Sequence, residues 1–526
     1  MSNNLLYFTF ASFLLVSSSS IAVNSVLSEK ELKLIRFISY LTYLQTSTNI
    51  TWNGWEKNYD GPQLGLDAIR YPLAHIGYTA AALAYRTPNY RELAVNILND
   101  TIKRMLTLKV WGYIDQYWQK TSTFPDPVYY ENIMYSGHLL QLIALYESIS
   151  GDLIYDTQGF DFVWTKDGSA ETTIHYTTSQ LVRAIYRQMD DDSSAGVSCE
   201  PGWVYTICQN HPHLGLKLYD VVRDGRTNFS RISSKWKDFL NHHALEDIPL
   251  YKKDRYFKML YQRSTHIWVP FFAATGNDGW ALAWMSSWYD QNQTSDFICN
   301  GWKVMYKNKY WQPAESGCYL EAGGYIGVRM QMNRWIATSF YPMVEKQCSI
   351  DATEKLACAY AWFENNFGTY LDIDHDGYFE SFYYETETVY SNWVTTNVLL
   401  SLLMGENRVE AKEFLRQIYA TKFHEKFQND EPEIIAVQYP TIRVTYAQYD
   451  STRKILVINF NTEKPSILST RFDIKYPNTF LTISNITRDG LTDGFSTKQV
   501  TNDRIRIEYS YNNLEKQQTK FHILFQ

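Results

Sequence analysis

The spacing of apolar residues changes once along this chain, near residue 430. From about residue 29 to residue 425, apolar side chains recur at intervals of three and four, the period of an amphipathic α-helix. After Asn429-Asp-Glu-Pro432 the interval falls to two, most strictly in Arg504–Tyr511, as in a strand with one buried face. We therefore predict a mainly α domain over residues 29–428 and a small antiparallel β domain of the sandwich type over residues 432–526.

The helical part consists of amphipathic segments separated by Pro, Gly and Asn–Asp clusters. Many helices joined in antiparallel pairs favour an α/α toroid, with helices in two concentric rings, over a simple bundle. In such a toroid the cavity lies at one end, where loops and helix starts meet. The predicted helices are Glu29–Leu44, Leu66–Tyr85, Tyr90–Leu108, Glu131–Ile149, Thr173–Met189, Leu214–Val222, Ser233–His243, Ser264–Ala274, Trp280–Tyr289, Cys348–Asn366 and Tyr390–Met404.

The composition argues against nucleic acid as a partner and leaves the role of the many aromatic residues open. The net charge is −7 and the chain has no basic tract, which argues against nucleic-acid binding, because phosphates are bound by clustered Lys and Arg. Aromatic residues make up 16% of the chain, with 41 Tyr. These rings either line a cavity or groove or belong to the core.

The N-terminus has the pattern of a secretory signal peptide over residues 1–22. The apolar run Leu5–Val16 is too short to span a bilayer, and small residues follow at Ser20-Ile-Ala22. We expect secretion or a secretory-pathway lumen, with an uncleaved N-terminal anchor as the alternative. Five glycosylation sequons agree with secretion; they are Asn49, Asn99, Asn228, Asn292 and Asn485.

The six cysteines would normally pair in an oxidising compartment. The short-loop pairings Cys299–Cys318 and Cys348–Cys358 are the first to consider. Cys199 and Cys208 then remain, and the sequence leaves two states open for them. They form either a disulfide or a pair of free thiols that face a pocket, where one thiolate accepts a proton and the other thiol donates one.

A second group of candidate residues lies at the start of a predicted helix. On a helix that begins near Glu131, the side chains of Glu131, Tyr135 and His138 fall on one face, and Gly137 leaves room for a close neighbour. A carboxylate, a phenol and an imidazole in one row suit proton transfer. The alternative is that His138 is a buried structural histidine.

These residues stand in blocks that resemble the linalool dehydratase/isomerase family, over a stretch from about Leu66 to Asp224. The resemblance implies an (α/α)6 barrel that needs no metal and no organic cofactor, and it leaves room for a homo-oligomer. The blocks are Val110-Trp-Gly112, Asp126-Pro127, Glu131-Asn-Ile-Met-Tyr-Ser-Gly-His138-Leu, and Cys199-Glu-Pro with Cys208. The catalytic residues that the resemblance implies are His138, Cys199, Cys208 and Tyr71.

The reaction implied is acid–base dehydration or isomerisation of an allylic, terpenoid-like alcohol, a small-molecule substrate. Substrate-binding candidates are Asp67, Tyr135, Glu131 and Trp111. The sequence departs from the family in its first helix, where the family has a catalytic Asp. Here Leu34–Thr48 contains no acid, Gln45 stands near the expected place, and Asp60 and Asp67 are the nearest substitutes.

Two other functions compete with this interpretation. A secreted carbohydrate-active α/α-barrel enzyme would use acids such as Asp278 and Glu385, and its Cys199–Cys208 pair would be a disulfide. A non-catalytic secreted binding protein would explain the missing Asp. Separately, Asp372-Ile-Asp-His-Asp-Gly377 copies the first half of a calcium loop, although Tyr383 stands where the bidentate Glu belongs, and an acidic turn is the other interpretation.

Overall fold

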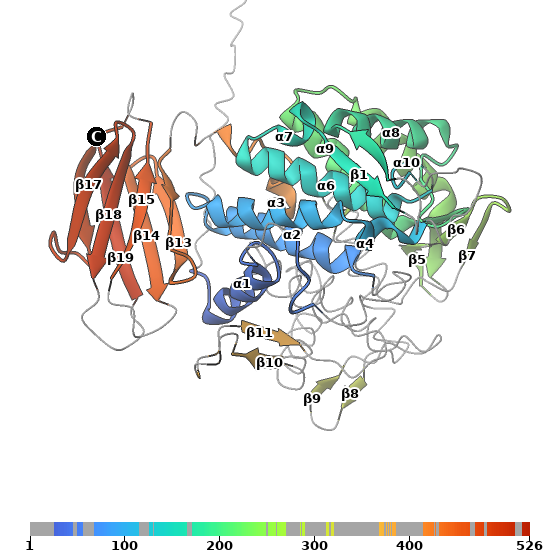
Figure 1. Cartoon of the computed structure of the whole chain (residues 1–526). Helices are drawn as coiled ribbons and strands as arrows, with labels where there is room; N and C mark the ends of the chain where they lie inside the picture. Colours follow the sequence, from blue (N-terminus) through green and yellow to red (C-terminus); the bar gives the residue numbers. More distant parts are fainter. Residues whose placement is uncertain are drawn as a thin grey trace, which may run out of the picture.

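A computed structural model of the chain shows a helical region beside a β-sandwich (Figure 1). It describes residues 26–45, 50–55, 68–114, 126–129, 131–165, 171–248, 251–258, 260–269, 284–285, 287–289, 312–314, 317–319, 368–372, 375, 377, 379, 381–384, 414–425, 427, 431–462, 469–477, 481–510 and 518–526. The expected signal peptide and most of residues 270–413 lie outside this set. None of the described helices is long and apolar enough to cross a membrane.

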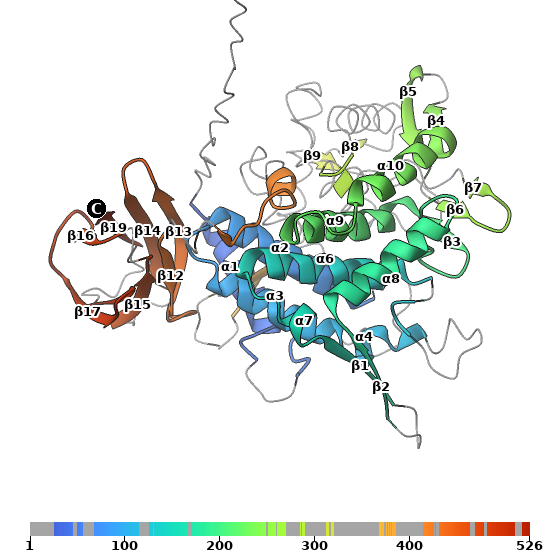
Figure 2. The ribbon, with the colours of Figure 1, turned by 90° about the horizontal axis from the view of Figure 1, so that it is seen from above.

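The described helices form an inner and an outer layer, and α6 lies in the inner one (Figure 2). Residues 133–149 of α6 are all buried, and α2, α3, α8 and α9 pack around this helix. By contrast α3 and α8 bury one face only, as outer helices do. The helices are α1 (Glu29–Leu41), α2 (Arg70–Arg86), α3 (Glu92–Met105), α4 (Leu108–Trp111), α6 (Ile133–Ser150), α7 (Ile154–Thr157), α8 (Thr178–Asp191), α9 (Thr206–Val222), α10 (Phe229–Phe239) and the π-helical turn Leu240–Ala244.

Two layers agree with the predicted toroid, but the closed (α/α)6 ring stays a prediction, because most of residues 270–413 are not described. The predicted room beside Gly137 is confirmed. A Cβ at Gly137 would lie 2.7 Å from Pro212 Cδ, and one at Gly215 would lie 2.7 Å from Leu140 Cγ. The backbones of α6 and α9 therefore approach each other more closely than side chains would allow.

Two predicted helix boundaries are wrong for local reasons. The helix predicted from Thr173 begins at Thr178, because the β-branched stretch before it forms strand β2 (Thr172–Tyr176), which pairs with β1 (Phe160–Trp164). A capping box between Thr177 and Gln180 starts α8. Helix α9 begins before the predicted Leu214, because Pro212 lies inside this helix instead of ending it.

The helix predicted over Ser264–Ala274 is also wrong where the structure describes it. Residues 263–266 form a turn, and the chain continues into β7 (Ile267–Val269). Strand β7 pairs with β6 (Leu260–Gln262), which pairs in turn with β3 (Trp203–Tyr205). This small sheet sits next to the loop that carries Cys199. Three further hairpins complete the described strands of this region. They are β4–β5 (Leu245–Ile248, Tyr251–Phe257), β8–β9 (Gln312–Ala314, Gly317–Tyr319) and β10–β11 (Gly368–Leu371, Ser381–Tyr384).

The predicted C-terminal β-sandwich is present. Two antiparallel four-stranded sheets, ordered β12-β15-β18-β17 and β13-β14-β19-β16, pack on a shared aromatic core. Ring centroids lie 4.7 Å apart for Phe460 and Phe472, 5.3 Å for Phe472 and Phe521, and 5.1 Å for Tyr509 and Phe521. The strands are β12 (Glu433–Ile435), β13 (Ile442–Asp450), β14 (Ile455–Thr462), β15 (Ser469–Lys475), β16 (Ile483–Arg488), β17 (Phe495–Thr501), β18 (Arg504–Ser510) and β19 (Gln518–Phe525).

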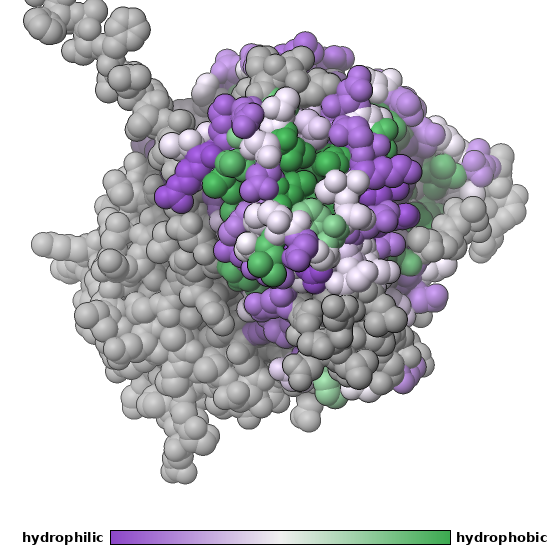
Figure 3. All heavy atoms as spheres, turned by 90° about the vertical axis from the view of Figure 1, so that its left-hand side faces the viewer, coloured by the Kyte–Doolittle hydropathy of each residue, from purple (hydrophilic) through white to green (hydrophobic). Residues whose placement is uncertain are grey.

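The outer end of the sandwich is less well covered than its middle. The edge strands β16 and β17 keep few residues buried. Viewed from this end of the molecule, apolar side chains are visible between bands of polar ones (Figure 3). Phe495 and Tyr509 are among the residues that line a cleft in this domain.

Asn89, in the turn between α2 and α3, connects the two regions. Its side-chain amide donates to the Pro432 carbonyl at 2.8 Å and accepts from the Tyr449 N–H at 2.8 Å. Its carbonyl accepts from the Ile434 N–H at 2.7 Å. Because Asn89 is fully buried, these bonds hold the sandwich against the helix that also carries Tyr71.

Candidate active site

The starts of three inner helices meet at the site. Tyr71 is the second residue of α2, Cys208 belongs to the first turn of α9, and Met134 belongs to the first turn of α6. The Tyr71 hydroxyl lies 3.5 Å from Met134 Sδ. The expectation that loops and helix starts build the cavity agrees with this arrangement.

Cys199 and Cys208 are both free thiols, so the disulfide alternative is not formed. Their side chains are hydrogen-bonded to each other. Cys199 is buried in the loop before β3, whereas Cys208 is half-buried. Burial, and next the hydrogen bond to Cys208, hold the pKa of the Cys199 thiol well above its usual value. Cys199 therefore keeps its proton.

Tyr71 lies within electrostatic range of both thiols. Burial raises the pKa of the Tyr71 phenol, the charge of Arg70 opposes that rise, and both cysteines add to it. The phenol consequently stays protonated near neutral pH and can donate a hydrogen bond. Tyr71 is only partly buried, in contrast to most of α2.

Arg70 brings a buried positive charge to the site, and sequence reasoning missed it. Its guanidinium carbon lies 4.7 Å from the centre of the Tyr71 ring and 4.5 Å from that of Tyr113. Its Nη2 is 3.3 Å from Met134 Sδ, and the residue is 1% exposed. An Arg directly before Tyr71-Pro72, at the start of an apolar helix, was the signal that could have found it.

His138 is buried on α6 in a cluster of rings. Its Nδ1 lies 2.5 Å from the Tyr78 hydroxyl, and its ring centroid lies 3.7 Å from that of His211 and 5.7 Å from that of Tyr71. Burial lowers the pKa of His138 well below its usual value, and the neighbouring His211, His75 and Arg70 lower it further. His138 is therefore a neutral imidazole near neutral pH.

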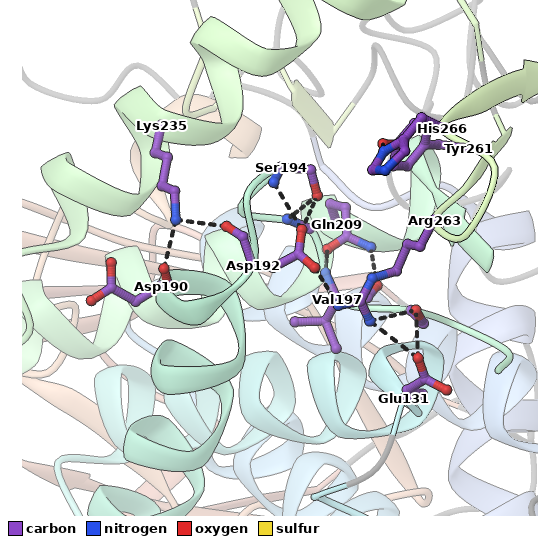
Figure 4. A network of polar contacts seen from close by, with 12 residues as sticks. Glu131, Asp190, Asp192, Ser194, Val197, Gln209, Lys235, Tyr261, Arg263 and His266 are labelled. Atoms are coloured by element: carbon purple, nitrogen blue, oxygen red, sulfur yellow. Dashed lines mark hydrogen bonds and ion pairs between the residues drawn. The ribbon is translucent and has the colours of Figure 1, made fainter. Parts of the chain in front are cut away.

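The predicted row of Glu131, Tyr135 and His138 is not formed, because α6 begins only at Ile133. Glu131 precedes the helix with a left-handed backbone (φ 43°). Its carboxylate pairs with Arg263 at 3.1 Å and accepts from the Ser198 hydroxyl at 3.2 Å. Arg263 also pairs with Asp192, so these charges fasten the loop that carries Cys199 to the β6–β7 turn (Figure 4).

Two further substrate-binding candidates have structural contacts. Tyr135 donates to the Met105 carbonyl at 2.7 Å, and Trp111 donates to the Leu106 carbonyl at 3.1 Å. Both rings pack against Phe162, at centroid distances of 6.3 and 5.7 Å. The α6 residues that do contact the cluster are Met134, His138 and Gln141, which share one face at helical spacing.

The acid that replaces the family's first-helix Asp is not identified, because Asp60 and Asp67 lie outside the described residues. Gln45 is described, and its amide belongs to a local turn. The Thr51 hydroxyl donates to Gln45 Oε1 at 2.5 Å, and Gln45 Nε2 donates to the Asn53 carbonyl at 2.5 Å.

Only part of the sequence that carries the predicted disulfides and the calcium loop is described. Cys299, Cys348 and Cys358 lie outside the described residues. Asp372 closes the β10–β11 hairpin and accepts from the Gly377 N–H at 2.7 Å, as in an acidic turn. Within the described part of the chain, no cluster of His, Cys, Asp and Glu has the composition of a metal site.

The comparison with known families bears on this same segment. Residues 70–313 match the model of the linalool dehydratase/isomerase family. This segment is therefore similar to the linalool dehydratase/isomerase family. The match begins at Arg70 and contains Tyr71, His138, Cys199 and Cys208, so the thiols and the rings around them lie within it. The β-sandwich lies outside the matched residues.

Proposed function

We propose that the helical region is a cofactor-independent lyase/isomerase that dehydrates or isomerises an allylic, terpenoid-like alcohol. The match of residues 70–313 to the model of the linalool dehydratase/isomerase family supports an enzyme of this type. The observation that carries the proposal is the pair of free, hydrogen-bonded thiols beside Tyr71. Two such groups supply the acid and the base that elimination of water requires.

The surroundings of the two thiols differ, and this difference assigns their roles. Cys199 is buried and retains its proton, so it is the acid that protonates the leaving hydroxyl. Cys208 is half-buried in the first turn of the 17-residue helix α9. The buried cation of Arg70 lies within electrostatic range of Cys208. Cys208 is therefore the base.

The protons balance over one turnover. Transfer of the Cys199 proton to the substrate hydroxyl lets the C–O bond break, and water leaves with the bonding electron pair. The Cys208 thiolate then removes a proton from the carbon next to the allylic cation, and a diene forms. The thiols end with their protonation states exchanged, and one proton transfer from Cys208 to Cys199 along their hydrogen bond restores the start. Isomerisation follows when water adds to the other end of the allylic cation.

Tyr71 and His138 hold the hydroxyl in this scheme. The protonated phenol of Tyr71 and the neutral ring of His138 can both hydrogen-bond an oxygen without carrying net charge. Free thiols also disfavour the carbohydrate-active interpretation, which predicts a disulfide at these positions.

The test is conversion of a panel of primary and tertiary allylic alcohols, followed by gas chromatography with mass spectrometry. We expect loss of water to a diene, or migration of the hydroxyl, without added metal or nucleotide. Hydration of the diene in D2O, the reverse reaction, should place deuterium at the carbon that Cys208 deprotonates in the forward direction. Hydrolysis of glycosides, with no conversion of any alcohol, would contradict the proposal.

We also propose that the chain enters the secretory pathway, on the N-terminal pattern and the sequons. Asn228 and Asn485 are exposed and can carry a glycan. Asn99 lies in α3 and accepts a hydrogen bond from the Tyr155 hydroxyl at 2.7 Å, so we expect it to stay unmodified. Peptide mapping after glycosidase treatment in H2(18)O checks this pattern, and unmodified Asn228 and Asn485 in the secreted protein would contradict it.

A further inference from the structure

A chain of buried hydrogen bonds begins at His138. The Tyr78 hydroxyl lies 2.5 Å from His138 Nδ1 and 3.3 Å from His211 Nδ1. All three side chains are buried. Burial raises the pKa of Tyr78 well above its usual value, so the phenol keeps its hydrogen and acts as the donor. His138 Nδ1 is then an acceptor, and the proton of the neutral ring is on Nε2.

The rest of the chain fixes the direction of this bond. His211 Nδ1 lies 2.8 Å from Gln141 Oε1, and Gln141 Nε2 donates to the Tyr419 hydroxyl at 2.5 Å. Because Gln141 Oε1 only accepts, His211 carries its hydrogen on Nδ1. The Tyr78 hydroxyl cannot donate to a nitrogen that already bears a hydrogen, so its hydrogen points to His138.

The charges around His138 favour the same neutral state. Its ring faces that of His211 at 3.7 Å, and two imidazolium ions at this distance would repel each other strongly. Arg70 and His75 on α2 disfavour a positive charge on His138 as well. Within the described part of the chain, the phenols of Tyr71 and Tyr78 also face His138, and both stay protonated.

We propose that Tyr78 and His211 are positioning residues that hold His138 as a neutral imidazole with its hydrogen on Nε2. His138 then donates a hydrogen bond to the substrate oxygen and does not protonate it, a task left to Cys199. The part of this inference that concerns the substrate rests on the proposed function. The tautomer of His138 does not.

Nitrogen-15 NMR of the full-length protein with labelled histidine tests the tautomer without any substrate. A His138→Gln variant assigns the signal by its disappearance. We expect one neutral tautomer for His138, with the hydrogen on Nε2, throughout the neutral pH range. A ring protonated on Nδ1, or an imidazolium near neutral pH, would overturn the inference whether or not the enzyme converts an alcohol.

Tyr78→Phe separates a positioning role from a purely structural one. Loss of the donor to Nδ1 removes a bond that stabilises the neutral ring, so the pKa of His138 should rise. Nitrogen-15 NMR should show the protonation of His138 at higher pH than in the wild type, and kcat/KM should fall about 10-fold. The matched control is Tyr146→Phe on α6, the helix that carries His138; the Tyr146 hydroxyl donates to Asp152 at 2.9 Å and lies outside the site.

Three outcomes are informative. A raised pKa of His138 in Tyr78→Phe, with an unchanged pKa of His138 in Tyr146→Phe, supports the role of Tyr78. An equal loss of rate in both variants without any shift overturns it. If Tyr78→Phe does not fold, the tautomer of the wild-type protein still decides.

Discussion

The site region and the β-sandwich both bury their interiors, but they bury different chemistry. Between α2, α6 and α9 the interior holds a guanidinium, several imidazoles and two thiols, as at Arg70, His138 and Cys199. Between the two sheets it is mainly apolar, with an aromatic cluster that includes Phe472 and Phe521. Buried polar groups cost stability unless they are hydrogen-bonded, so their presence in an interior indicates a role other than stabilising the fold. The comparison predicts that substitutions in the two regions affect different measurements.

The largest effect should follow Cys208→Ala. Removal of the proposed base should lower kcat by about 10²–10⁴-fold. The free energy of unfolding should change by no more than about 1 kcal/mol, because Cys208 is half-buried and small. Steady-state kinetics and urea denaturation of the same preparation measure both quantities. Full activity in this variant would remove the base from the mechanism.

Phe521→Ala should give the reverse pattern. Phe521 is fully buried among the aromatic rings of both sheets, and its loss should destabilise the sandwich by about 3–5 kcal/mol. Turnover per folded molecule should stay at the wild-type value, because this residue lies in the sandwich and not at the helix starts. Urea denaturation followed by circular dichroism gives the stability. A strong loss of turnover in the folded variant would show that the sandwich shapes the site.

Asn89→Ala tests whether the two regions unfold together. The substitution leaves the Pro432 carbonyl and the Tyr449 N–H without their partner, which should cost about 1–3 kcal/mol. We expect the sandwich to unfold before the helical region, so that thermal unfolding shows two transitions. Differential scanning calorimetry distinguishes this result from a single transition at lower temperature, which would mean that other contacts keep the regions coupled.

The smallest effect should be the acid sensitivity of the sandwich. Asp473 is buried on β15, and its carboxylate accepts from Arg504 Nε at 2.6 Å and from Arg506 Nε at 2.8 Å. Although burial by itself would raise the pKa of Asp473, the two guanidiniums outweigh it and lower this pKa below its usual value. The stabilisation is therefore present above the unfolded pKa of about 3.9 and is lost as the pH falls through the lower folded pKa.

Asp473→Asn checks this dependence. The variant should lose about 1–2 kcal/mol of stability near neutral pH, a modest value because both arginines are partly exposed. Its stability should also fall less steeply than that of the wild type at acidic pH. Urea denaturation at several pH values compares the slopes, and parallel slopes would assign the acid sensitivity to other carboxylates.

The sandwich could be predicted because each of its strands carries its own period-two pattern. Arg504–Ser510 alternates in sequence and is a strand in the structure. The described helices were predictable for the same reason, except at their ends and in Ser264–Ala274, where the chain forms a turn and β7. Two examples show why. Residues Thr172–Tyr176 form a strand because they pair with β1 in a hairpin, and Pro212 fits inside α9 because it packs closely against Gly137. Neither neighbour is visible in the local pattern.

The site residues that belong to sequence motifs could be predicted, whereas those brought to the site by packing could not. His138, Cys199 and Cys208 stand in recognisable blocks, but their free thiol state required the structure. Glu131 was placed on the helix because the sequence does not show its left-handed backbone. Arg70, Tyr78 and His211 were missed, because each acts through residues that are distant in the chain, such as Met134, His138 and Gln141.

The state of the two sulfur atoms tests the account most directly. Native protein purified without reductant can be alkylated, unfolded, alkylated again with a heavier reagent, and mapped by mass spectrometry. We predict that Cys208 takes the first label, that the buried Cys199 takes the second, and that no peptide links them. A disulfide-linked peptide that joins Cys199 to Cys208 would contradict the central claim that this site works through a pair of reduced thiols.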